Sequence, residues 1–71
     1  MSDKKVGRYN NLLAEMVRKD ISREQIAETI ERSYNQTRLK INGKHPLTLE
    51  EAVTIQETHF PDIDLKHLFH R

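Results

Sequence analysis

Three closely spaced helix-start signals constrain the folding of this 71-residue chain more than any other feature. Ser22 and Ser33 are each followed three residues later by a glutamine, and Thr48 is followed in the same way by Glu51. In such a capping box, a hydroxyl group and a longer polar side chain satisfy free N–H groups at a helix N-terminus. Because the first two signals are only 11 residues apart, the helices are short. Helices of this length are marginal alone and must pack against one another.

Apolar spacing and helix-stop signals complete the prediction of an all-α fold. The first helix is predicted by one apolar stripe at helical spacing, made by Tyr9, Leu12, Leu13, Met16 and Val17. Asn42-Gly43 is typical of a left-handed helix end, Pro61 interrupts the chain, and Asp64 can cap a last turn. We therefore predict five helices, at about 8–19, 23–31, 34–42, 49–58 and 64–69. The predicted core consists of Leu12, Leu13, Met16, Ile26, Ala27, Ile30, Ile41, Leu49, Val53, Leu65 and Leu68.

Length and composition bound the class of protein. A chain of 71 residues without cysteine has one small domain at most, which we expect at residues 8–71 after a flexible segment at 1–7. Two glycines and two prolines argue against a turn-rich β-fold. The longest apolar run, Leu12-Leu13-Ala14, is far shorter than the ~20 residues of a membrane span. We therefore expect a soluble cytoplasmic protein with no membrane partner.

Motifs that would carry enzymatic chemistry are missing from the sequence. It has no cysteine, no glycine-rich phosphate loop and no nucleophile motif, and a small helical domain leaves little room for a ligand pocket. His67 and His70 could share a metal, but no third ligand accompanies them, and we interpret them as surface residues. His45 and His59 are interpreted as loop and helix-end residues. We expect no enzyme, no cofactor, no metal and no small-molecule substrate.

Charge is unevenly distributed, although the net charge is only +1. The segment from Arg32 to Lys44 contains four basic residues and no acid, whereas the segment from Glu50 to Asp64 contains five acids and no lysine or arginine. Such blocks are as typical of solvated faces as of a binding surface. The low net charge argues against a high-affinity nucleic-acid binder, because such domains are usually more basic.

Two short helices joined by a brief turn are the ingredients of a helix-turn-helix. The stretch from Ile21 to Ile30, together with Ser33 and Ile41-Asn42-Gly43-Lys44, resembles that motif in phage Cro and CI-type repressors, the XRE-like family. With a tail at 60–69 that resembles the closing helix of this family, the resemblance covers about residues 8–69. The opening Tyr9-Asn10-Asn11-Leu12-Leu13 is similar to small antirepressors of lactococcal temperate phages, the modulator-of-repression type. The resemblance implies a five-helix domain of the lambda-repressor-like kind, acting in the bacterial host cell.

The sequence agrees with the family pattern at one position and departs from it at three. Ala27 lies where the second and third helices cross, and a small side chain allows close approach there. Glu31 stands where the family usually has glycine, Arg32 where it has isoleucine or valine, and Thr37 where it buries an aliphatic side chain. These departures leave the turn less well specified and put ordinary operator recognition in doubt.

The resemblance assigns a partner- or DNA-binding surface to the third helix and its flanks. This candidate surface consists of Arg32, Ser33, Tyr34, Asn35, Gln36, Arg38, Leu39, Asn42 and Lys44. On one hypothesis the chain is an antirepressor that binds its cognate CI-type repressor, with Tyr34 and Leu39 as exposed apolar anchors. The alternative is a Cro-like repressor of operator DNA, in which the amides and Arg38 read bases while Arg32 and Lys44 contact phosphates. A third interpretation, simple exposure of a polar face, stays open.

Overall fold

Five α-helices form the part of the chain that the structure, a computed structural model, describes, namely residues 9–70. They are α1 (Asn10–Lys19), α2 (Arg23–Ile30), α3 (Tyr34–Ile41), α4 (Leu49–His59) and α5 (Leu65–Leu68), and these residues contain no β-strand. Each boundary lies within two residues of its predicted position. The segment expected at residues 1–7 lies outside the described residues.

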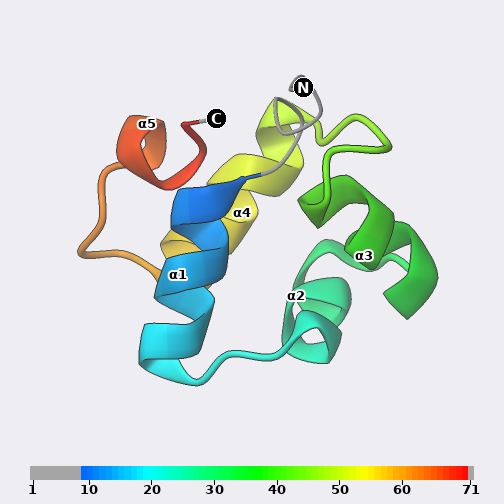
Figure 1. Cartoon of the computed structure of the whole chain (residues 1–71), viewed down its shortest axis with the longest axis horizontal. Helices are drawn as coiled ribbons and strands as arrows, with labels where there is room; N and C mark the ends of the chain where they lie inside the picture. Colours follow the sequence, from blue (N-terminus) through cyan, green and yellow to red (C-terminus); the bar gives the residue numbers. More distant parts are fainter. Residues whose placement is uncertain (1–8, 71) are drawn as a thin grey trace.

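Helix α4 lies in the middle of the molecule, with α5 on one side and the α2–α3 pair on the other (Figure 1). It contacts both α2 and α5, α2 also contacts α3, and α1 contacts α5. None of the helices formed by residues 9–70 has the length and apolarity that crossing a membrane requires.

The predicted capping groups are present at four of the five helix N-termini. Ser22 Oγ accepts a hydrogen bond from Gln25 N at 3.1 Å, and Gln25 Oε1 accepts one from Ser22 N at 2.8 Å. Thr48 and Glu51 form the same reciprocal box at the start of α4. At the start of α3 only half of the predicted box is present, in which Ser33 Oγ accepts from the backbone of the third helical residue. The left-handed Gly43 (φ 83°) ends α3, as predicted.

The core contains most of the predicted residues. Leu12, Met16, Ile26, Ala27, Ile30, Ile41 and Leu68 are buried, whereas Leu13, Val53 and Leu65 are only partly buried. The predicted core omits the fully buried Phe60. This residue stands directly before Pro61 and outside the predicted helices. Tyr9 joins this core through an edge-to-face contact of its ring with that of Phe69, at 5.6 Å between centroids.

Two residues assigned to apolar inner faces are exposed. Val17 is 82% exposed and Leu49 is 73% exposed. Leu12 and Met16 define the inner face of α1, and Val17 lies roughly 100° farther around the helix than Met16. In α4 the inner face is set instead by Glu51, Ala52 and Ile55. Burial of a glutamate there turns Leu49 toward solvent, so the predicted burial of Leu49 was wrong. Val17 belongs to the apolar stripe predicted for the first helix but lies outside its buried side.

We expect Ala27→Leu to destabilise the domain by about 1–3 kcal/mol, because the larger side chain would overpack the buried face of α2. Thermal or urea unfolding followed by circular dichroism measures this change. Glu28→Leu introduces the same side chain at the next, exposed position and should leave stability nearly unchanged. Equal stability of the two variants would contradict the packing of Ala27.

Candidate interaction surface

The turn between α2 and α3 forms without the glycine that such turns favour. Glu31 adopts a left-handed conformation (φ 57°, ψ 45°) at the end of α2. Its backbone N–H donates to Glu28 O, and the N–H of Arg32 donates to Ala27 O at 3.0 Å. Glu31 therefore takes the conformation in which glycine is the least strained residue. The three residues 31–33 then lead directly into α3.

Helix α3 is held to the core by two fully or almost fully buried side chains, Thr37 and Ile41. The hydroxyl group of Thr37 has no hydrogen-bond partner, although its oxygen is buried. A buried hydroxyl without a partner is destabilising compared with an aliphatic group of the same shape. Thr37 is therefore packed in the core, but its hydroxyl group weakens the attachment of α3.

The candidate surface is largely accessible, but its members differ in exposure. Arg32, Ser33, Tyr34, Asn35, Gln36 and Lys44 are exposed, whereas Arg38, Leu39 and Asn42 are partly buried. Tyr34 is 49% exposed, as expected for an anchor. Arg38 Nη2 donates to Asn35 Oδ1 at 2.8 Å, so these two candidate base readers contact each other.

Leu39 corrects the expectation of a second fully exposed apolar anchor. The backbone after α3 folds back, and the N–H groups of Lys44 and His45 both donate to Leu39 O, at 2.9 and 3.3 Å. This local turn follows from the left-handed Gly43. Tyr34 is thus the large apolar residue of the candidate surface that remains substantially exposed.

A buried carboxylate draws together residues that the sequence separates into a basic and an acidic block. Glu51 is 7% exposed. Its Oε2 accepts from Arg32 Nε at 3.0 Å, and its Oε1 lies 3.1 Å from Lys40 Nζ. The same Oε1 accepts from Thr48 N, which completes the cap of α4. We call Glu51, Arg32 and Lys40 the ion-pair node.

The ion-pair node keeps Glu51 ionised. Burial alone raises the pKa of this carboxyl group, but the backbone N–H of Thr48 and the cations of Arg32 and Lys40 outweigh burial and lower the pKa below its ordinary value. Sequence analysis placed Glu51 only as a capping residue. The absence of any acid within the basic block was the available signal that a distant carboxylate would pair with it.

Within residues 9–70 no group of three or more histidine or acidic side chains is placed to hold a metal ion. Comparisons of the sequence with protein-family models, with curated proteins and with solved structures find no match.

Replacing the buried hydroxyl group tests the weak attachment of α3. We expect Thr37→Val to raise the free energy of unfolding by about 1 kcal/mol, since it removes a hydroxyl without a partner and keeps the side-chain shape. Chemical denaturation measures the difference. Thr54→Val is a control on the exposed side of α4, where the hydroxyl already donates to Glu50 O. A destabilised Thr37→Val variant would mean that this hydroxyl is satisfied in solution.

We expect Glu51→Gln to lower stability at pH 7 by about 1–3 kcal/mol, because charge-assisted hydrogen bonds are lost while the cap can persist. The lowered pKa of Glu51 fixes the sign of the pH dependence. Its contribution is complete above the ordinary value of 4.5 and disappears as the pH falls through the folded-state pKa.

The difference in melting temperature between Glu51→Gln and the unsubstituted protein should therefore shrink as the pH is lowered from 7 to 3. Glu50→Gln removes a neighbouring exposed acid and is the matched control. If the melting temperatures of Glu51→Gln and the unsubstituted protein differ by the same amount at every pH down to 3, the ion-pair node does not make this contribution.

Proposed function

We propose that this chain is a helix-turn-helix regulator of the lysis-lysogeny switch of a temperate phage. In this proposal it is an antirepressor that binds the cognate CI-type repressor through the face of its helix-turn-helix, formed by α2, residues 31–33 and α3. The short connection, the left-handed Glu31 and the buried Ala27 support the motif. The resemblance to Cro and CI-type regulators supports the class.

The exposure of Tyr34 is the observation that carries the choice of a protein partner. The residue is 49% exposed and lies in the first turn of α3. Tyrosine is enriched among the residues that dominate protein interfaces, because it buries a large area with little loss of conformational freedom. A reader of the DNA groove gains most of its affinity from phosphates and hydrogen bonds instead.

The ion-pair node supports the same choice. Arg32 and Lys40 are two of the four cations in the basic block, and both face the carboxylate of Glu51. Their positive charge is therefore partly neutralised before any DNA approaches. Non-specific attraction to DNA depends on cations that neutralise phosphates and release counterions, so this surface is poorly supplied for it.

Competition for a surface is the mechanism that follows. By covering the DNA-reading helix of the repressor, the bound chain would free the lytic promoter. The step involves no chemistry and needs no cofactor or small-molecule substrate.

Direct operator binding is the second candidate function. The exposed amides of Asn35 and Gln36 favour it, since such amides can form paired hydrogen bonds with adenine in the major groove. Arg38 could contact guanine after release from Asn35. A Cro-like repressor would use these same residues.

We expect Tyr34→Ala to weaken binding to the CI-type repressor encoded beside this chain by about 30-fold, as a dominant interface residue would. Isothermal titration calorimetry measures the affinity, and circular dichroism checks that the helices persist. Leu49→Ala truncates another exposed apolar side chain, on α4, and should bind with the affinity of the unsubstituted protein.

Gel shifts with the phage promoter region distinguish the two functions. Operator binding alone would weaken by orders of magnitude between ~50 and ~200 mM salt, whereas an apolar protein contact would tolerate the same change. A salt-sensitive shift by the isolated chain, together with no repressor complex at micromolar concentration, would replace the antirepressor by the Cro-like repressor.

A further inference from the structure

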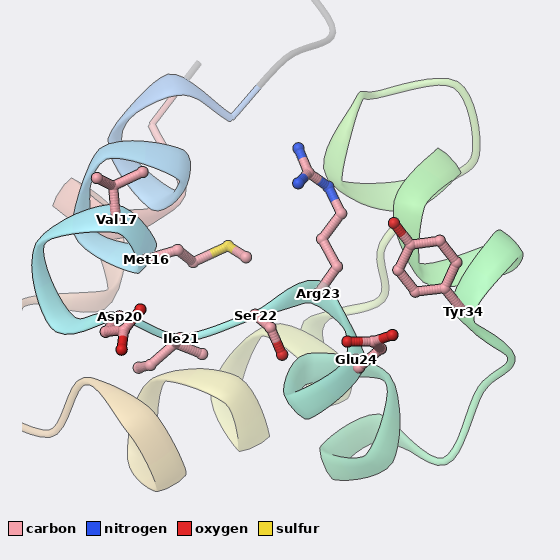
Figure 2. A pocket seen from close by; sticks show the side chains of 8 residues that line it. All are labelled: Met16, Val17, Asp20, Ile21, Ser22, Arg23, Glu24 and Tyr34. Carbon is pink, nitrogen blue, oxygen red and sulfur yellow. The ribbon is translucent and has the colours of Figure 1, made fainter.

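A groove between α1, α2 and α3 lies beside the candidate surface and includes residues that sequence analysis did not assign to any partner. Its volume is about 410 Å³. Figure 2 shows Met16 reaching in from α1 and Tyr34 from α3, with the side chain of Arg23 standing between them. Because Tyr34 belongs to both, the groove and the candidate surface are continuous.

The walls of the groove expose apolar side chains. Three large hydrophobic residues are exposed in the described part of the chain, and two of them, Val17 and Tyr34, line this groove. Ile21 and Met16 extend the apolar lining toward the core. Exposed apolar groups that line one hollow are typical of a surface that another protein covers.

Arg23 supplies the positive charge within the groove. Its Nε is buried and has no hydrogen-bond partner, and no ion pair joins it to Asp20 or Glu24, which also line the groove. The desolvation of this N–H is therefore uncompensated in the isolated protein. A carboxylate is the best complement to a guanidinium group, because two parallel hydrogen bonds can form between them.

Asp20 and Glu24 decide between a carboxylate and a nucleic-acid backbone. Both side chains are exposed at the groove. A DNA strand carries a phosphate on every nucleotide and would bring further negative charges toward these two acids, which is unfavourable. A single carboxylate on a protein segment brings only one negative charge, next to Arg23, and so meets less of that repulsion.

We propose that the groove receives a segment of the CI-type repressor in which an aliphatic or aromatic side chain lies next to a carboxylate. The apolar side chain packs between Val17 and Tyr34, and the carboxylate pairs with Arg23. This inference rests on the proposed function, because it names the same partner. It extends the contact from α3 to the end of α1 and the start of α2.

Titration of the full-length repressor with two variants tests the groove. We expect Arg23→Gln to weaken binding by roughly 10-fold or more, through loss of a charge-assisted hydrogen bond. Val17→Ala should weaken it about fivefold, through loss of buried methyl groups. The matched controls, Lys66→Gln on α5 and Leu49→Ala on α4, are exposed residues away from the groove and should change affinity by less than about twofold.

The outcomes separate this inference from the proposed function. If both groove variants bind normally and Tyr34→Ala binds more weakly, the groove is not part of the interface, whereas the proposed antirepressor function stands. If only Val17→Ala loses affinity, the partner does not place a carboxylate at Arg23. If Arg23→Gln weakens a gel shift with promoter DNA but not the repressor complex, the anion is a phosphate and the inference is wrong. Failure of the unsubstituted chain to bind the repressor overturns both proposals.

Discussion

The arrangement of α2, α3 and α4 depends on the hydrogen bonds and ion pairs that the carboxylate of Glu51 makes. It accepts hydrogen bonds from the backbone at the start of α4 and from Arg32 in the turn before α3, and it pairs with Lys40 within α3. An ionised group that is almost fully buried is stable only with such donors around it. Because Lys40 lies in α3 and Glu51 in the first turn of α4, their ion pair links these two helices directly.

The same arrangement has a consequence for binding. Every cation that the carboxylate holds is less able to attract a phosphate, so the positioning of α3 works against affinity for DNA. The polar residues left on the face of α3 can still form specific hydrogen bonds, but the long-range attraction that brings a protein to DNA is reduced. A protein partner does not need that attraction if it can bury Tyr34. The electrostatics therefore support the proposal of a protein partner more than that of operator DNA.

Local signals in the sequence predicted the helices, and tertiary contacts explain the errors. The boxes at Ser22 and Thr48 depend on residues within one turn, so their boundaries could be derived without a fold. Exposure of Leu49 depends instead on which face of α4 meets the ion-pair node, and that partnership spans 19 residues between Arg32 and Glu51. The candidate surface was predicted on α3 and its flanking residues. Its neighbouring groove also contains residues of α1 and α2, and no local pattern places these together.

Unfavourable local features cluster in one region of the molecule. Asp20 and Glu31 have left-handed backbone conformations, which are unfavourable for residues with a β-carbon. Thr37 buries a hydroxyl group without a partner, and Arg23 buries a donor without an acceptor. All four residues lie between the end of α1 and α3. Departures from local consistency are expected where binding, and not folding, has shaped the sequence. A partner carboxylate would meet the terminal Nη groups of Arg23, because Nε is buried and is not open to a partner. The free energy of binding in the groove would therefore come from a new charge-assisted contact at Nη and from burial of the apolar lining.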